Sequence, residues 1–156
     1  MCQRYQTRDY EPGDFESLVA LRTRLFKDDF ILLGLWSDEW NREHLKGMIS
    51  RNQHWSIVID SELIGFVQWS QRLDELHVQY LAIAPEFVRL GIGSKVLQEL
   101  QAKARQDCVP ITLALFHNHP EAVAFYQKAG FTVVDTTDRF VRMMWAPESS
   151  VRFGKI

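Results

Sequence analysis

The segment from Leu76 to Gly93 constrains the fold of this chain more than any other. It reads as an apolar strand, a proline at position 85, a short loop, and then Gly91-Ile92-Gly93 at the start of an amphipathic helix. A turn that leads from a strand into a helix presents the unpaired backbone N–H groups of the helix N-terminus, and such groups bind phosphate. This order therefore predicts an anion-binding turn within an α/β fold.

Two common phosphate-binding fingerprints do not fit this glycine turn. A Rossmann fingerprint requires a third glycine where this chain has Val96. A P-loop ends in Gly-Lys-Ser/Thr, whereas the order here is Gly93-Ser94-Lys95. Taken alone, the turn is also compatible with a tight connection that binds no ligand.

Composition limits the classes of function. The 156 residues suit one domain, and a formal net charge of -2 gives no basic footprint for nucleic acid. The longest apolar run, residues 30–36, is too short to cross a bilayer, and the first residues lack the apolar segment of a signal peptide. Cys2, Cys108 and the histidines offer neither a disulfide framework nor a metal-ligand spacing. We therefore expect a single domain over residues 1–147 with a flexible tail over 148–156, in a reducing cytoplasm, without a nucleic-acid, membrane or metal partner.

Hydrophobic periodicity and turn residues predict the elements. Asp14 and Ser37 are expected as the N-caps of two helices, and Asp60-Ser61-Glu62 as a hairpin turn. Two more helices are expected over residues 93–105 and 121–129, the second ended by Gly130. Strands are expected over residues 3–10, 55–59, 63–70, 76–83, 110–116, 132–135 and 139–145. The order predicts an α/β (α+β) fold, in which a mixed, mostly antiparallel central sheet of about seven strands is flanked by four helices.

A second motif, NHPEAVAFYQKAGF, extends from Asn118 to Phe131. Together with the strand, Pro85 and the glycine turn, it resembles the GNAT superfamily of acyl-CoA-dependent N-acyltransferases. The resemblance covers nearly the whole chain, although before about residue 60 it is one of layout only. It implies a GNAT-like acyltransferase fold and acetyl-CoA as the co-substrate.

Coenzyme A carries a pyrophosphate and a pantetheine arm, and the resemblance implies where each would bind. The backbone of Arg89 to Ser94 is expected at the pyrophosphate, and the strand edge from Leu81 to Ile83 at the pantetheine amides. Val88 stands where the family usually has Arg or Gln, with Arg89 beside it, and this departure weakens the case for tight acetyl-CoA binding. The expected cofactor-binding set is Leu81, Ala82, Ile83, Val88, Arg89, Leu90, Gly91, Ile92, Gly93, Ser94, Asn118, His119, Tyr126 and Lys128.

The resemblance also suggests catalytic residues. Tyr126 matches the family tyrosine that protonates the departing thiolate, although it also fits a core aromatic position. A general base must take a proton from the acceptor ammonium, and family members often place a carboxylate for this on the strand before Pro85. His77 matches that position and titrates near ~6.5, but a structural histidine is the alternative. Asp74 and Glu75 are rival bases, expected in an exposed turn.

Other candidates have plain structural alternatives. Asp28, Asp29, Trp36 and Trp40 lie where the family builds its acceptor wall and would suit a cation, but they also fit a solvated turn with core tryptophans. The family asparagine corresponds to Asn118 or His119, for which helix capping is the alternative. Cys108 is expected to be an inert buried thiol.

These expectations combine into an N-acetyltransferase (EC 2.3.1.-). It would transfer acetyl from acetyl-CoA to a primary amine of a small-molecule or peptide acceptor, by direct attack in a ternary complex. A homodimer is one assembly that the family resemblance implies. Two other functions stay open, a catalytically silent acyl-CoA-binding or sensory module and an interaction domain with a vestigial pocket. The sequence identifies neither the acceptor nor the acyl chain.

Overall fold

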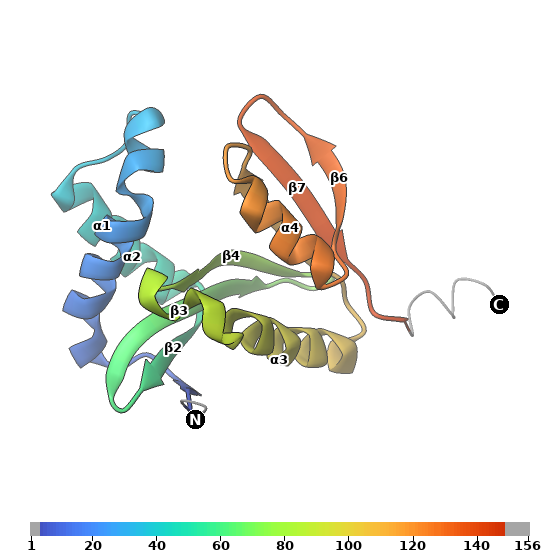
Figure 1. The fold of residues 1–156 in the computed structure, drawn as a ribbon, viewed down its shortest axis with the longest axis horizontal. Helices are drawn as coiled ribbons and strands as arrows, with labels where there is room; N and C mark the ends of the chain where they lie inside the picture. Colours follow the sequence, from blue (N-terminus) through green and yellow to red (C-terminus); the bar gives the residue numbers. More distant parts are fainter. Residues whose placement is uncertain (1–3, 149–156) are drawn as a thin grey trace. The chain divides into compact units, whose positions relative to one another are not determined.

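The computed structural model describes residues 4–148, and its elements follow the expected order (Figure 1). The helices are α1 (Phe15–Leu32), α2 (Asp38–Arg51), α3 (Ile92–Asp107) and α4 (Pro120–Lys128), with short 3-10 turns η1 (Pro12–Asp14) and η2 (Pro85–Leu90). The strands are β1 (Gln6–Arg8), β2 (Gln53–Ile59), β3 (Glu62–Gln71), β4 (Leu76–Ile83), β5 (Ile111–Phe116), β6 (Thr132–Thr136) and β7 (Phe140–Trp145). All but the first residue of the expected tail lie outside the described residues.

The strands pair in one sheet of seven, in the order β1-β2-β3-β4-β5-β7-β6. β4 and β5 run parallel, whereas the pairs β1–β2, β2–β3, β5–β7 and β6–β7 are antiparallel. The expected mixed, mostly antiparallel sheet is therefore confirmed. Along the chain, two compact units alternate, one of residues 1–69 and 80–93 and the other of residues 70–79 and 94–156.

Local signals in the first unit behave as expected. The Ser37 hydroxyl accepts a hydrogen bond from the Trp40 backbone N–H at 2.9 Å, which caps α2. Asp60 and Ser61 adopt φ of 49° and 68°, the pair of left-handed residues that a tight hairpin between β2 and β3 requires. α1 and α2 pack together, and a core forms from Leu18, Leu21, Leu45, Phe66, Ala82 and Ala84.

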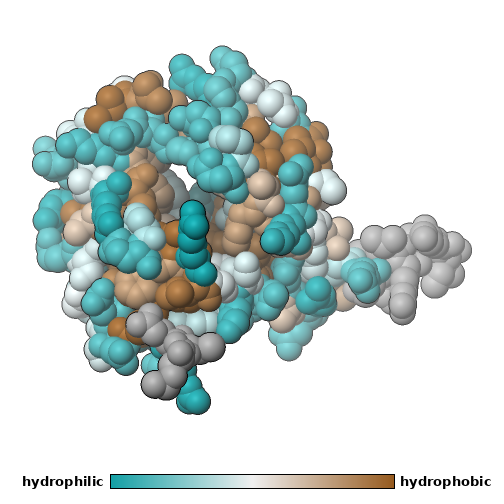
Figure 2. All heavy atoms as spheres, in the orientation of Figure 1, coloured by the Kyte–Doolittle hydropathy of each residue, from teal (hydrophilic) through white to brown (hydrophobic). Residues whose placement is uncertain are grey.

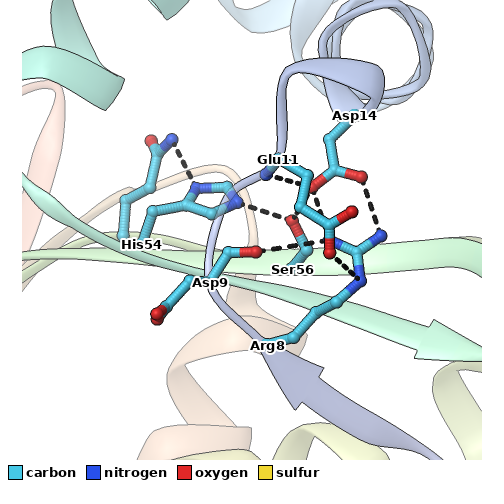
Figure 3. A network of polar contacts seen from close by, with 7 residues as sticks. Arg8, Asp9, Glu11, Asp14, His54 and Ser56 are labelled. Carbon is cyan, nitrogen blue, oxygen red and sulfur yellow. Dashed lines mark hydrogen bonds and ion pairs between the residues drawn. The ribbon is translucent and has the colours of Figure 1, made fainter.

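Asp14 precedes α1 as expected, but its side chain does not cap that helix. It ends η1, and its carboxylate accepts hydrogen bonds from the Glu11 backbone N–H at 3.0 Å and from Arg8 at 2.7 Å (Figure 3). The Ser56 hydroxyl donates to the same carboxylate at 2.8 Å. Burial opposes ionisation, but these hydrogen bonds outweigh it and hold the pKa of Asp14 at about 2. Asp14 therefore occupies the expected N-cap position of α1 but makes no side-chain capping hydrogen bond, because its carboxylate points back toward β1 and β2.

The second unit buries apolar side chains from α3, β5, α4 and β7. α4 ends in Gly130 at φ 100°, as expected, and a Cβ there would lie 3.2 Å from the Trp145 ring. Cys108 is exposed rather than buried, because the chain turns at that residue with φ 56° before β5 begins. The prediction of a core thiol was therefore wrong.

Hydrophilic residues cover much of the face seen in Figure 2, with separate hydrophobic patches, one of them over the end of α1. The large exposed apolar side chains in that region are Ile31, Leu32 and Leu35. Among the described helices, none combines the length and the apolar character needed to cross a membrane.

Candidate active site

The glycine turn adopts the conformation that anion binding requires. Gly91 ends η2 with φ 78°, in the left-handed region, and α3 begins at the next residue. The first backbone N–H groups of α3 therefore have no partners within the helix. A Cβ on Gly91 would meet nothing within 4 Å, so backbone conformation rather than space restricts this position. Residues 88–91 are exposed, so their backbone is accessible to a ligand.

An ion pair with α1 holds one side chain of the 3-10 turn η2 that precedes Gly91. Arg24 on α1 forms a two-pronged ion pair with Glu86 in η2, one of whose contacts measures 3.0 Å. Val88 is 55% exposed and offers no charge, and Arg89 beside it is also exposed. The exposed polar groups at this turn are therefore those of the main chain, with Arg89 as the adjacent cation.

Just before the glycine turn, β3 lies unusually close to β4. A Cβ on Gly65 of β3 would lie only 2.4 Å from the Ala82 carbonyl oxygen, so β3 can approach β4 here only at a glycine. Ala82 is buried, whereas Leu81 and Ile83 are half-buried. The Ala84 backbone N–H then donates to the Ile64 carbonyl at 2.7 Å, which fixes the start of η2.

In the second unit, His77, Thr112 and Glu75 form a hydrogen-bonded chain. The strands β4 and β5 pair in parallel with His77 opposite Thr112. His77 Nδ1 lies 2.7 Å from the Thr112 hydroxyl, which donates in turn to a Glu75 carboxylate oxygen. Glu75 was expected in an exposed turn, but its side chain is only 26% exposed because of this contact. Asp74 is exposed, as expected.

The direction of these hydrogen bonds determines the protonation of His77. A carboxylate only accepts, so the single hydrogen of the Thr112 hydroxyl points to Glu75. His77 Nδ1 must then donate to the hydroxyl oxygen, which leaves Nε2 with the lone pair in the neutral ring. Burial lowers the pKa of His77, and the charge of Arg72 acts in the same direction. His77 is therefore a neutral base at neutral pH, with Nε2 as its basic atom.

Tyr126 lies on α4 and is buried. Its ring makes edge contacts with Phe125 at 5.0 Å and Phe131 at 5.3 Å between centroids. Burial raises the pKa of Tyr126, so the phenol stays protonated and is able to donate its proton. Tyr126 is therefore a core aromatic whose phenol is protonated.

The residues before α4 do not cap it with their side chains. His119 is the N-cap residue and contributes its carbonyl, which accepts from the Ala122 N–H at 3.0 Å, while its ring lies 3.4 Å from Glu121. Asn118 is exposed and precedes the cap. Lys128 is exposed in the last turn of α4. Helix capping therefore does not explain the side chain of Asn118 or that of His119.

The expected acceptor wall is mainly aromatic. Trp36 and Trp40 lie 6.2 Å apart between ring centroids, and Trp40 lies 5.0 Å from Phe30. Asp28 is exposed and Asp29 half-buried, both near the end of α1.

Sequence reasoning missed a polar group beside this wall. Arg22 and Asn41 are fully buried and hydrogen bonded to each other, and His44 lies 3.3 Å from the Tyr80 hydroxyl. One signal was available, because Arg22 falls on the apolar stripe of α1, one turn after Leu18.

The expected site residues divide between the two units. The first unit contains the β4 edge, the glycine turn up to Gly93 and the acceptor wall. The second contains Glu75, His77, Ser94, Asn118, His119, Tyr126 and Lys128.

The chain thus carries a strand edge that leads into a glycine turn at a helix N-terminus, and a buried tyrosine on α4. The chain belongs to the acetyltransferase (GNAT) family, whose family model matches residues 16–131. Its co-substrate is therefore acetyl-CoA.

Relatives and solved structures agree with this assignment. The uncharacterized N-acetyltransferase YafP of Escherichia coli (strain K12) is 23% identical over 154 residues, which is 95% of each chain. The PaiA N-acetyltransferase of Thermoplasma acidophilum, solved in complex with coenzyme A, has a TM-score of 0.77 at 22% identity and matches 92% of this chain and 99% of its own. Arabidopsis thaliana Naa50, solved with a bisubstrate analogue, has a TM-score of 0.73 at 16% identity and matches 92% and 99%. At these identities the structures establish the fold.

Proposed function

We propose that this protein transfers the acetyl group of acetyl-CoA to a primary amine of a small-molecule or peptide acceptor, by direct attack in a ternary complex. The observation that carries the proposal is the chain from Glu75 through Thr112 to His77. These hydrogen bonds make His77 Nδ1 a donor and leave the lone pair on Nε2. An amine acceptor needs such a base to remove its proton.

The proton transfers follow from the two titratable residues. At neutral pH an alkyl amine is mostly protonated, because its pKa is near ~10. We assign His77 Nε2 the role of taking that proton, directly or through a water molecule. The free amine then forms the amide bond as the carbon–sulfur bond breaks, and the Tyr126 hydroxyl gives its proton to the departing sulfur. The second proton that the nitrogen loses restores the Tyr126 hydroxyl through water, and His77 releases its proton to solvent.

The remaining expected residues bind the donor. When bound, acetyl-CoA supplies an acyl group activated as a thioester. We assign the pyrophosphate to the main chain of Arg89–Ser94 and the pantetheine amides to the edge at Leu81–Ile83, where one N–H group would polarise the acyl carbonyl. Val88, Asn118, His119 and Lys128 would flank the donor, and the wall of Asp28, Asp29, Trp36 and Trp40 would face the acceptor. The homodimer and the cytoplasmic location stay predictions from sequence and family resemblance.

The test is a screen of primary amines with acetyl-CoA and thiol detection, followed by the pH dependence of kcat/KM for the best acceptor. We expect His77→Gln to lower kcat by ~10²–10⁴-fold, the usual contribution of a general base. The wild-type profile should fall on the acid side with an apparent pKa below 6.5, because burial lowers the pKa of His77. His77→Gln should lack that acid limb.

Thr112 provides a matched pair of variants. Thr112→Ser keeps the hydroxyl that holds His77 Nδ1, so it should keep most activity, whereas Thr112→Val removes it and should lose about tenfold or more. Equal activity of the two Thr112 variants would contradict the role assigned to His77. Acetyl-CoA binding without thiol release for any amine would favour the silent binding module instead. A melting temperature that acetyl-CoA does not raise would favour the interaction domain.

A further inference from the structure

A fully buried guanidinium in the first unit has no partner for its outer edge. Arg22 on α1 has no exposed surface, and in the part of the chain that the structure describes neither Nη1 nor Nη2 has a hydrogen-bond partner. Arginine cannot lose its charge in a protein. A buried charge without a counterion is strongly unfavourable for folding, so its retention needs an explanation other than stability.

Asn41 on α2 fixes the orientation of this guanidinium. Its Oδ1 accepts from Arg22 Nε at 2.7 Å. Its amide nitrogen lies 3.3 Å from both the Val19 carbonyl oxygen and the Thr23 hydroxyl. Asn41 is itself fully buried, and both of its side-chain polar atoms are hydrogen bonded. The Nε edge is therefore held by the protein, and the two Nη groups are left for another partner.

The groups around the Nη edge are aromatic. The guanidinium carbon lies 5.6 Å from the centre of the Phe26 ring and 5.2 Å from that of Tyr80. These ring faces offset part of the charge, and the Tyr80 hydroxyl raises the pKa of Arg22 through a side-chain contact, although neither Nη atom lies within hydrogen-bond distance of a partner among the described residues. The Tyr80 hydroxyl lies 3.3 Å from His44 Nε2, and burial raises the pKa of Tyr80 while the Arg22 charge opposes the rise.

The charge of Arg22 is little compensated by its neighbours. Burial lowers the pKa of Arg22, and the only group that raises it is Tyr80, so no carboxylate compensates the cation among the described residues. A carboxylate is planar, carries a single charge and matches the two Nη groups in a forked pair. Tyr80, Phe26 and His44 are only half-buried, so rotation of one of these side chains would give access to the buried edge.

We propose that Arg22 binds a carboxylate of the acceptor, so that the amine substrate is an amino acid or another amine that carries a carboxylate beside an apolar group. The position of Arg22 supports this, because its neighbour Tyr80 directly precedes Leu81 on β4. The aromatic wall also begins there, since the rings of His44 and Trp40 are stacked with centroids 4.6 Å apart. The proposal rests on the function proposed above.

The primary test compares two probes that differ in charge but not in shape. Phenylacetate and its neutral analogue phenylacetamide are titrated by calorimetry into the protein without acetyl-CoA. We expect phenylacetate to bind at least ~10-fold more tightly, the usual gain from hydrogen bonds to a charged group. Equal affinities would overturn the proposal, and this comparison requires no variant.

Two arginine variants locate the effect. Arg22→Met should abolish the preference for phenylacetate, whereas Arg42→Met should keep it, because Arg42 forms a surface pair with Glu16. Retention of the preference by Arg22→Met would overturn the proposal. Since methionine removes an unpaired buried charge at similar length, we expect the melting temperature of Arg22→Met to stay level or rise. A clear fall would indicate a structural cation and count against the proposal.

Matched acceptors separate this proposal from the proposed function. L-phenylalanine and 2-phenylethylamine are assayed with acetyl-CoA, and we expect the amino acid to have at least ~10-fold higher kcat/KM. Faster or equal acetylation of 2-phenylethylamine would overturn the carboxylate site and leave the transferase function intact. Selective binding of phenylacetate without turnover of any amine would support the site and refute the transferase function.

Discussion

His54 should make the stability of this protein fall between pH 7 and pH 4.5. It lies on β2, is 8% exposed, and stacks on Phe66 with centroids 6.0 Å apart. His54 Nδ1 lies 3.1 Å from Gln68 Nε2. His54 Nε2 lies 2.8 Å from the Ser56 hydroxyl (Figure 3). Because Ser56 gives its hydrogen to Asp14, His54 Nε2 is the donor and Nδ1 the acceptor. Protonation would therefore place a second hydrogen against the amino group of Gln68.

The magnitude follows from the pKa. Burial lowers the pKa of His54 from 6.5 to about 4. The unfolded chain thus binds a proton near pH 6.5 and the folded protein only near pH 4, so stability is lost as the pH falls through this window. The difference between the two pKa values corresponds to about 3 kcal/mol in total, of which about 2 kcal/mol is lost between pH 7 and 4.5. Asp14 does not interfere, because its pKa moves from 3.8 to about 2 and its stabilisation is lost below that window.

The assay is urea denaturation of the wild type and of His54→Gln at pH 7 and 4.5, with linear extrapolation to water. The variant loses stability at pH 7, because the stacked ring is removed, but it carries no titratable group at this position. Its loss between the two pH values should be smaller than that of the wild type by about 2 kcal/mol. The His44 contribution is common to both proteins and cancels.

His117→Gln is the matched control, since His117 is exposed. It should lose as much stability as the wild type between pH 7 and 4.5. A His54→Gln variant that loses as much as the wild type, within ~0.5 kcal/mol, would refute the reasoning, because His54 would then not be the neutral buried group that the network requires.

Two further predictions concern glycines. Gly91→Ala should weaken acetyl-CoA binding in calorimetry and cost about 1–2 kcal/mol of stability, because alanine disfavours φ 78° even though its Cβ would meet nothing within 4 Å; unchanged affinity would show that the turn does not hold the donor. Gly65→Ala should cost about 1–3 kcal/mol in denaturant unfolding, because its Cβ would lie 2.4 Å from the Ala82 oxygen. Wild-type stability of that variant would mean that β3 and β4 separate there without strain.

Local chemistry explains which sequence predictions succeeded. Ser37, Asp60-Ser61 and Gly130 act through their own backbone or that of near neighbours, so their roles are visible in the sequence. Asp14 shows the limit of this approach. Its carboxylate has a local donor in Glu11, but Ser56 lies 42 residues away and no local rule predicts that contact. The same holds for Cys108, whose exposure depends on how the chain turns into β5.

The candidate site divides along the same line. The glycine turn and Tyr126 belong to continuous motifs, and both are found on the expected elements. The protonation state of His77 depends on the parallel pairing of β4 with β5, which brings Thr112 to it from 35 residues away. That pairing, rather than the local sequence, sets which ring nitrogen of His77 carries the hydrogen.

By itself the sequence determined the order of elements, the glycine turn at Gly91 and the family, because periodicity, turn chemistry and contiguous motifs act over a few residues. Only the tertiary structure decided which polar groups are satisfied. It gave Asp14 its hydrogen-bond partners and fixed the tautomer of His77. Among the described residues, it left the buried Nη groups of Arg22 without a hydrogen-bond partner. The reason is physical: the strength of a hydrogen bond or a charge depends on burial and on partners brought from distant parts of the chain.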